Sequence, residues 1–399
     1  MTNKRIRVAL SMGSLYGGGS ERQLVQILEH LDRDRFEPFL YLVYQKGELL
    51  SRVPDDVPVH AFDVRTNEPK LYWPGRMHTR RVNDFSKFLR EQEIDIAYDR
   101  TFHMTMIAGP ATQAAGVSRV STIVTDPNHD FHQIAGRFKK LKWRILRQAY
   151  LSADAVIGVS AGVTAAAKAF WRLPGNNLQT VLNSLDVKAV SQAGSNPFST
   201  EDDGSEDRDQ PFRIVAAGRL HPQKGFDLLI RATAKLVRDR GLNQLRVHIL
   251  GDGPEEASLR QLIQSEGMTE YVSLEGYQTN ANDWYRNSQL FVLSSRYEGM
   301  PNALMEAMAC SVPVVAFDCP SGPAEVLREG AYGALVPAED VNALAAAIGG
   351  VHDHYEPMKA RAERAFGYIE SEFALPTCVR KLEEVFETIV RGKNGSAAD

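Results

Sequence analysis

Two glutamates, Glu298 and Glu306, follow a predicted strand, at the point where a predicted helix begins. The apolar run from Leu290 to Ser294 predicts a buried strand, and Pro301 suits a first helical position because no backbone N–H is needed there. Glu298 is therefore expected in the turn and Glu306 about two turns into the helix. A carboxylate at such a place can grip sugar hydroxyls, while the helix amino terminus attracts phosphate. An ordinary capped core helix is the plain alternative.

Positive charge follows a second predicted strand, Arg213 to Ala217. The turn after it contains Gly218, Arg219 and, just before the next predicted helix, Lys224. Open α/β sheets bind their ligands at the carboxyl ends of parallel strands. Arginine can hold two phosphate oxygens at once and lysine adds a mobile charge, so this pair suits a departing diphosphate. An arginine and a lysine in a loop are otherwise ordinary solvated surface.

Two glycine turns complete the pattern. Gly18 and Gly19 follow the predicted strand Ile6 to Met12, and Ser20 is expected to cap the next helix. This loop is neither a dinucleotide fingerprint, whose third glycine is missing, nor a phosphate-binding P-loop. Gly253 lies in a Gly-Asp-Gly turn after another predicted strand. Each turn is weak evidence alone, because short glycine turns after strands are common.

Together, these motifs resemble the signature of retaining glycosyltransferases of family 4, also called the group 1 type. The resemblance places Glu298 near the donor sugar and Glu306 on the nucleotide ribose. It places Arg219 and Lys224 at the leaving diphosphate, so that Arg219, Lys224 and Glu298 are expected to take part in catalysis. The donor-binding residues that it implies are Gly18, Gly19, Gly218, Arg219, Lys224, Gly253, Glu298, Gly299, Met300, Pro301, Asn302 and Glu306.

One position departs from the family pattern. Many relatives carry a histidine near the transferred sugar, after the strand that corresponds to Val120–Thr125. Here Thr125 and Asp126 stand where His-Asp is common, and His129 comes later. The resemblance therefore leaves His129 or Asp126 as candidates for a catalytic role, with a solvated loop as the equal alternative.

Strands and helices alternate along the whole chain, which indicates an α/β fold with parallel sheets. A chain of 399 residues exceeds the usual size of one core, so two domains are expected. The resemblance implies the GT-B fold, two facing Rossmann-like domains with a cleft between them. We expect an acceptor-binding domain at 1–190, a flexible acidic insertion at 191–210 and a nucleotide-sugar-binding domain at 211–374. Residues 375–399 are expected to form a helix that crosses back to the first domain, followed by a tail.

Composition excludes several classes of protein. A net charge of -4 argues against nucleic acid as the main partner. The 3 cysteines have no spacing typical of a metal site, and their odd number fits a reduced, cytoplasmic protein. No signal peptide is visible at the start, and the apolar stretch Ala149–Phe170 contains too many polar residues to span a bilayer.

By resemblance, we expect a retaining transferase that moves a hexosyl or N-acetylhexosaminyl group from a nucleotide diphosphate donor. A UDP-sugar is favoured, with GDP-mannose as the other candidate. The acceptor would be a hydroxyl of a glycan, a lipid-linked glycan or a small molecule in polysaccharide or glycolipid biosynthesis. No cofactor and no metal are implied. The alternatives are a nucleotide-sugar epimerase or phosphorylase of the same fold and a non-catalytic nucleotide-sugar-binding partner subunit.

Two basic stretches lie in the first half, one at Arg76–Arg81 and one at Lys139–Arg147. The second is predicted to be a helix with interleaved aromatic and apolar residues, including Trp143. A solvated helix face is the default interpretation. The alternative is an anionic membrane surface, to which the protein would bind peripherally at the inner face.

Overall fold

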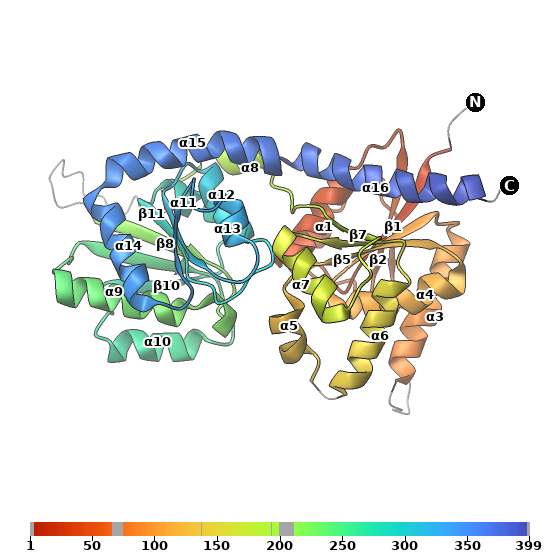
Figure 1. Ribbon diagram of the computed structural model, residues 1–399, viewed down its shortest axis with the longest axis horizontal. Helices are drawn as coiled ribbons and strands as arrows, with labels where there is room; N and C mark the ends of the chain where they lie inside the picture. The colour runs from red at the N-terminus through yellow and green to blue at the C-terminus, as the bar shows by residue number, and fades with distance from the viewer. Residues whose placement is uncertain (1–3, 66–74, 137, 193, 199–210, 397–399) are drawn as a thin grey trace. The chain divides into compact units, whose positions relative to one another are not determined.

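The computed structural model of the chain describes residues 4–65, 75–136, 138–192, 194–198 and 211–396 (Figure 1). The chain forms two compact units. Unit 1 consists of Met1–Ser184 and Leu375–Asp399, and unit 2 consists of Leu185–Ala374. Each unit is a Rossmann-like α/β domain, so the expected fold class is confirmed.

The described part of unit 1 holds a 7-stranded sheet in the order β3-β2-β1-β4-β5-β6-β7, and all its neighbouring strands are parallel. The strands are β1 (Ile6–Met12), β2 (Phe36–Leu42), β3 (Val59–Ala61), β4 (Ile96–Arg100), β5 (Ser118–Ile123), β6 (Ala155–Gly158) and β7 (Leu178–Thr180). The helices are α1 (Gly19–His30), the 3-10 turn η1 (Glu48–Arg52), α2 (Phe62–Arg65), α3 (Arg76–Glu91), α4 (Phe102–Ala115), α5 (Pro127–Ile134), α6 (Lys139–Leu151), α7 (Ala161–Trp171) and α16 (Leu375–Ser396).

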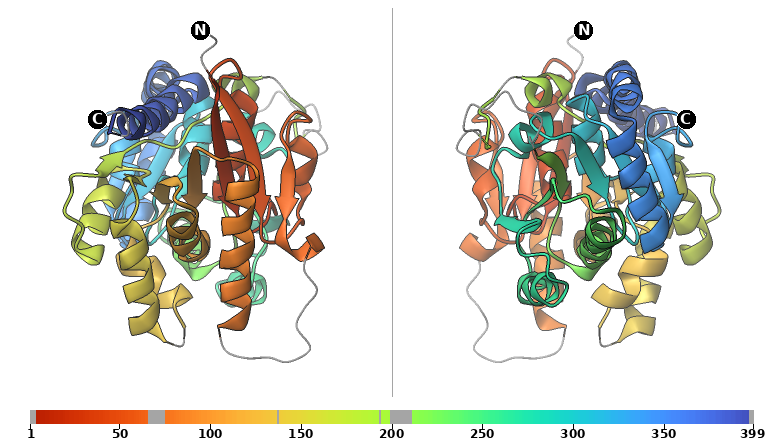
Figure 2. Two further views of the ribbon diagram at one scale, coloured as in Figure 1. Left: turned by 90° about the vertical axis from the view of Figure 1, so that its right-hand side faces the viewer. Right: turned by 90° about the vertical axis from the view of Figure 1, so that its left-hand side faces the viewer.

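Both faces of this sheet are covered, so the central strands β1, β2, β4 and β5 are almost entirely buried, although β4 and β5 also contain polar residues. Successive side chains of β1 alternate between faces, so Val8 and Leu10 join one cluster and Ala9 joins the other. The first cluster also takes Val379 and Phe386 from α16. In the left-hand view of Figure 2, α16 (dark blue) lies on one side of unit 1, and α3 (orange) and α6 (yellow) lie on the other.

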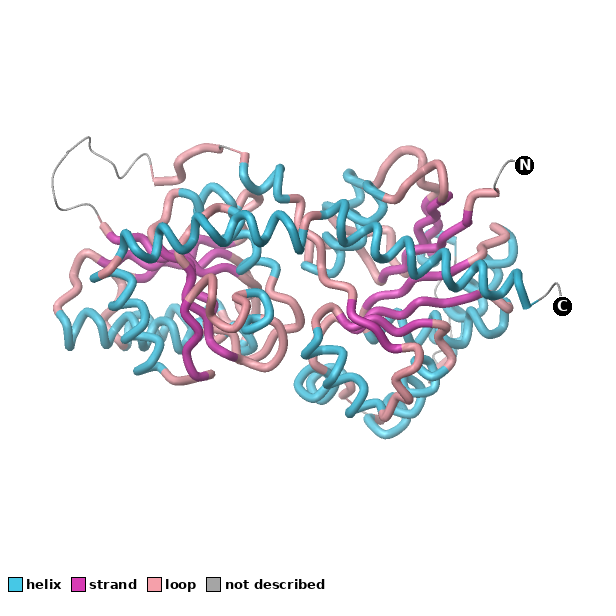
Figure 3. Tube along the Cα trace, turned by 45° about the horizontal axis from the view of Figure 1, so that its top comes forward, coloured by secondary structure: helices cyan, strands magenta, loops and turns pink. Residues whose placement is uncertain are grey.

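The described part of unit 2 holds a 6-stranded parallel sheet in the order β10-β9-β8-β11-β12-β13. Figure 3 shows strands in magenta and helices in cyan. The strands are β8 (Phe212–Ala217), β9 (Leu245–Leu250), β10 (Val272–Gly276), β11 (Leu290–Leu293), β12 (Val314–Asp318) and β13 (Ala334–Pro337). The helices are α8 (Val187–Ser191), the 3-10 turn η2 (Pro222–Lys224), α9 (Phe226–Arg240), α10 (Glu256–Ser265), α11 (Ala281–Arg286), α12 (Asn302–Ala309), α13 (Pro323–Val326), α14 (Val341–Asp353) and α15 (Tyr355–Phe373).

Two local predictions are wrong. Ser20 does not cap α1, because the helix already begins at Gly19 and Gly18 occupies the cap position without a side-chain hydrogen bond. Pro301 is the N-cap residue of α12 rather than its first helical residue. As a result Glu306 lies little more than one turn into that helix, about 3.6 residues being one turn.

The expected insertion at 191–210 falls partly outside the described residues, which resume at 211. Within its described part Phe198 is packed, since it is 2% exposed and its ring lies 5.1 Å from that of Trp284, whereas most of the other residues there are exposed. Among the described helices, none combines the length and apolar character that crossing a bilayer would require.

Candidate functional site

The candidate site in unit 2 is built from the loops that leave two neighbouring strands, β8 and β11. These strands pair in parallel, Leu290 opposite Ile214, so both loops emerge at the carboxyl edge of the sheet. The loops are bonded to each other directly. The backbone N–H of Arg296 donates to the carbonyl of Gln223 at 2.7 Å, and the Ser294 hydroxyl donates to the carbonyl of Lys224 at 2.9 Å.

Across this junction, Lys224 and Glu298 form an ion pair. Lys224 Nζ lies 2.6 Å from Glu298 Oε1, and the Ser295 hydroxyl donates to the same oxygen at 2.6 Å. Both contacts fall on Oε1, so Oε2 of Glu298 accepts no hydrogen bond from the described residues. The carboxylate is thus fixed in position with one oxygen left to accept a bond from a ligand hydroxyl.

Burial makes this pairing necessary. Glu298 is 5% exposed, and a carboxylate withdrawn from water is costly unless a cation and hydrogen bonds compensate it. The Lys224 side chain is 21% exposed, so it contacts the carboxylate and still borders solvent in part. One lysine can therefore compensate Glu298 and remain near a phosphate that enters from the solvent side.

Arg296, which the sequence interpretation gave no role, holds the two loops in register. Its guanidinium bonds both oxygens of Asp227 at 2.9 and 2.8 Å and donates to the carbonyl of Pro222 at 2.7 Å. It also reaches Glu339 at 2.9 Å. These contacts raise the pKa of Arg296, chiefly through the hydrogen bond to Asp227. Its place within the Ser-Arg-Tyr-Glu-Gly segment was the only signal that could have indicated this role.

Glycine is required where the loops approach most closely. Gly225 has φ +60, and a Cβ there would lie 2.0 Å from the carbonyl oxygen of Ser294. A Cβ on Gly253, in the turn after β9, would lie 2.4 Å from the carbonyl oxygen of Leu220. Close backbone packing therefore accounts for Gly253 as well as a ligand contact would.

Arg219 precedes Lys224 and Glu306 follows Glu298 in the sequence, but neither takes part in the ion pair. Arg219 is exposed and has no ion pair or hydrogen bond with another described side chain. Glu306 is half-buried in α12 and accepts a bond from the Tyr285 hydroxyl at 3.5 Å. Of the residues predicted in this unit, the structure brings Lys224 and Glu298 into contact, and Gly299 to Asn302 continue the same loop into α12.

The two thiols near these loops are not nucleophiles. Burial, followed by the charge of Glu298, raises the pKa of the Cys319 thiol, and burial raises that of Cys310 to about 12. Both thiols therefore stay protonated at neutral pH, where a cysteine nucleophile would need to be a thiolate. No group of three or more metal-binding side chains occurs within the described ranges.

The predicted residues of unit 1 lie in two loops. Gly18 and Gly19 are exposed at the start of α1, and the carboxylate of Glu21 folds back so closely that a Cβ on Gly18 would lie 2.4 Å from it. Burial raises the pKa of Glu21, although Arg100 acts in the opposite direction. A half-buried carboxyl next to exposed glycines fits a loop that faces a ligand.

Asp126 and His129 sit at the start of α5. The Asp126 side chain is 6% exposed and accepts from both the backbone and the side-chain nitrogen of Asn128 at 2.9 Å. It is the N-cap of the helix, which explains its type without a ligand. His129 is half-buried in the first turn, and a catalytic role for either residue stays a prediction.

Two family models match the chain in succession. The model described as Glycosyltransferase Family 4 matches residues 17–189, and the model described as Glycosyl transferases group 1 matches residues 211–354. The two matches fall on units 1 and 2 and include all the predicted site residues.

Individual relatives share parts or most of this length. The chain is 39% identical over 178 residues to an exopolysaccharide phosphotransferase of Streptomyces coelicolor, a match that covers 44% of this chain and 19% of that protein. It is 27% identical to N-acetylgalactosamine-N,N'-diacetylbacillosaminyl-diphospho-undecaprenol 4-alpha-N-acetylgalactosaminyltransferase of Campylobacter jejuni, over 85% of this chain and 88% of that protein. Among solved structures, Anabaena HepE in complex with UDP-glucose superposes with a TM-score of 0.78 at 22% identity, covering 96% of this chain and 100% of that one.

Proposed function

We propose that this chain, which belongs to the family 4 glycosyltransferases of the group 1 type, moves a sugar from a nucleotide diphosphate donor with retention of configuration. It is a glycosyltransferase of the GT-B type in polysaccharide or glycolipid biosynthesis. We propose a nucleotide diphosphate sugar as the donor, a glycan hydroxyl as the acceptor and retention as the stereochemical outcome. The observation that carries them is the buried Lys224–Glu298 pair at the carboxyl edge of the unit 2 sheet.

The donor diphosphate would lie against Arg219 and Lys224. Arg219 is exposed and unpaired among the described residues, so its guanidinium is available to fork onto two phosphate oxygens. Lys224 supplies a second charge from the same loop. The sugar would lie over Glu298, whose Oε2 can accept from a hydroxyl, and Glu306 would bind the ribose. A UDP-sugar is favoured over GDP-mannose, and HepE, the structural neighbour, was solved with UDP-glucose.

The proposed reaction is a front-face substitution. The acceptor oxygen attacks the anomeric carbon while the bond from that carbon to the diphosphate oxygen breaks, and the acceptor proton passes to the departing phosphate. Arg219 and Lys224 stabilise the negative charge that develops there, an effect worth about 3–4 kcal/mol for a well-placed group. No enzyme nucleophile is needed, in keeping with the protonated thiols of Cys310 and Cys319.

The acceptor is a hydroxyl of a glycan, either free or linked to a lipid. The Campylobacter relative is named for an acceptor linked to diphospho-undecaprenol and for a product with an α linkage. Its 88% coverage makes it the more informative guide, since the Streptomyces match spans less than a fifth of that protein.

A thermal-shift screen of purified protein against nucleotide sugars tests the donor. A ligand at a hundred times its dissociation constant should stabilise the protein by about 2.7 kcal/mol. The stabilising donor is then incubated with and without candidate acceptors, and products are read by mass spectrometry. Transfer that requires an acceptor supports the proposal. Isomerised donor without an acceptor indicates an epimerase, and binding without turnover indicates a non-catalytic partner subunit.

A further inference from the structure

The amino-terminal end of α6 presents apolar side chains to solvent. Phe138, the cap residue, is 73% exposed, and Leu141 in the first turn is 56% exposed. Phe138 also has φ +66, a conformation that is uncommon for a bulky residue and carries a cost. Phe138 thus has a strained backbone conformation, and its exposed side chain makes no contribution to the core of unit 1.

Packing of α6 does not explain these residues, because other side chains face the core. Leu146 and Tyr150 are buried, and the ring of Trp143 lies 6.1 Å from that of the buried Trp171. Trp143, the aromatic that the sequence pattern singled out, thus faces inward. Phe138 and Leu141 are the apolar groups left on the outside.

The charges of this helix end are also unusual. Lys139 and Lys140 occupy the first turn, which has no acidic residue and no side-chain cap. Positive charge at a helix amino terminus opposes the helix dipole, so both lysines destabilise the helix locally. Lys139, Lys140 and Arg144 are exposed and make no ion pair within the part of the chain that the structure describes. A bound anion would satisfy the lysines and the uncapped N–H groups together.

Neighbouring helices add to the positive field. The amino-terminal ends of α3 and α6 point to the same end of unit 1 (Figures 1 and 2). Partial burial, together with Arg81, His78 and Lys142, lowers the pKa of His103, so basic groups of α3, α4 and α6 come close to one another. A surface of this sign attracts phosphate groups.

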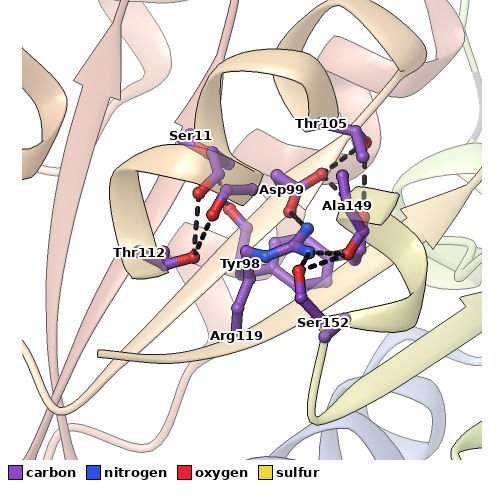
Figure 4. Close-up of polar contacts among 12 residues, drawn as sticks. Ser11, Tyr98, Asp99, Thr105, Thr112, Arg119, Ala149 and Ser152 are labelled. Atoms are coloured by element: carbon purple, nitrogen blue, oxygen red, sulfur yellow. Dashed lines mark hydrogen bonds and ion pairs between the residues drawn. The ribbon is translucent and has the colours of Figure 1, made fainter. Parts of the chain in front are cut away.

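The opposite end of α6 is hydrogen-bonded to Arg119 of β5, which also forms a buried ion pair within the sheet (Figure 4). Arg119 of β5 pairs with Asp99 at 3.0 Å, with side chains 1% and 0% exposed, and its guanidinium also donates to the carbonyl of Ala149. The Ser152 hydroxyl lies 3.5 Å from the same guanidinium. The carboxyl-terminal end of α6 is therefore held by the sheet, and its amino-terminal end is the one that faces solvent.

We propose that the amino-terminal end of α6 docks on an anionic lipid bilayer, with Phe138 and Leu141 inserted at the head-group level and Lys139, Lys140 and Arg144 against lipid phosphates. Exposed apolar groups ringed by unpaired cations match the chemistry of such a surface, where both charge and shallow apolar burial contribute. The inference does not depend on which sugar the enzyme transfers.

Vesicle co-sedimentation tests the docking. Full-length protein is mixed with vesicles of phosphatidylcholine alone or with phosphatidylglycerol, at 0.1 M and 1 M salt, which shorten the Debye length to about 10 Å and about 3 Å. We expect binding only to the anionic vesicles and at least a tenfold loss of binding at high salt. Absence of binding to anionic vesicles at low salt would overturn the proposal.

Two variants separate the contributions. Phe138→Ser with Leu141→Ser should weaken vesicle binding about tenfold, as should the triple variant Lys139→Gln, Lys140→Gln, Arg144→Gln. A matched control removes three exposed positive charges elsewhere, at Lys359, Arg364 and Arg380. Equal losses in the control and the α6 triple variant would show a non-specific charge effect and contradict the proposal.

Integrity is checked in each variant by its melting temperature and by donor binding in the thermal-shift assay. Donor binding should match the wild type and the melting temperature should not fall, because the altered side chains are exposed and the two lysines oppose the dipole of α6. Self-association is measured in the absence of lipid as well. If the serine variant lowers self-association while vesicle binding is unchanged, the apolar end is an interface between copies of this chain. That result would show the lipid proposal to be wrong.

Discussion

Lys224 Nζ lies 2.6 Å from Glu298 Oε1, and this contact joins the loops that leave the adjacent strands β8 and β11. Removing Lys224 would therefore affect the stability of the fold as well as the charge placed at the leaving diphosphate. It would leave a carboxylate that is only 5% exposed without its cation. Substitution of Lys224 is therefore expected to lower stability as well as activity.

Lys224→Met should depress transfer by about a hundredfold and also destabilise the fold by about 1–3 kcal/mol, the typical cost of leaving a buried polar group unsatisfied. The added variant Glu298→Gln removes the buried charge, so the double variant should regain stability but not activity. Urea unfolding and transfer assays on the two variants measure both effects. A double variant no more stable than Lys224→Met would show that the pair is not the source of the loss.

Arg219→Gln should lower transfer by about a hundredfold with no change in melting temperature. The side chain is exposed and unpaired among the described residues, so its removal costs no native contact. Steady-state kinetics with the identified donor, together with a melting curve, provides the measurement. Normal turnover in this variant would remove Arg219 from the proposed mechanism.

Substitutions of the two glutamates should affect different steps, nucleotide binding for Glu306 and sugar transfer for Glu298. Glu306→Gln should weaken binding of the free nucleoside diphosphate, because its proposed partner is ribose. Glu298→Gln should spare that affinity and lower transfer, because its proposed partner is the sugar. Calorimetric titration of each variant with the diphosphate compares them. Equal loss of affinity in both variants would reject the assignment of roles.

The Arg119–Asp99 pair of unit 1 should behave as a structural ion pair. Arg119→Met leaves Asp99 charged and buried, which should lower the free energy of unfolding by about 3–5 kcal/mol. Adding Asp99→Asn should restore part of the lost free energy of unfolding, since no unpaired buried charge then remains. Urea unfolding of both variants tests this, and a single variant as stable as the wild type would contradict it.

Much of the fold follows from local patterns. Strand β1 matches its predicted bounds, and β8, β9 and β11 differ by a residue at an end, because long apolar runs bounded by turns are strong signals. Strand β3 was missed, since Val59–Ala61 is short and includes a histidine. The pairing of Asp99 with Arg119 was also missed, because polar residues within a strand give no sign of whether they are buried together.

For the candidate site, the sequence predicted individual residues, and the structure was needed to show which of them are in contact. The motifs predicted Lys224 and Glu298 separately, each in the turn after a predicted strand, and the family resemblance supplied their roles. Their contact could not be predicted, since it depends on the register of two loops that are 74 positions apart in the chain. The roles of Ser295 and Arg296 likewise appear only once the loops are placed side by side.

Hydrogen exchange followed by mass spectrometry tests the central claim most directly, because it reports where the donor binds. Saturating nucleotide-sugar donor should slow amide exchange in peptides that cover 218–225 and 294–306, the two loops joined by Lys224 and Glu298. Peptides from the carboxyl-terminal halves of α9 and α10, which lie away from the carboxyl edge of the sheet, should not change and serve as the internal control. Unchanged exchange in both loops, with the donor bound at saturation, would contradict the proposed site.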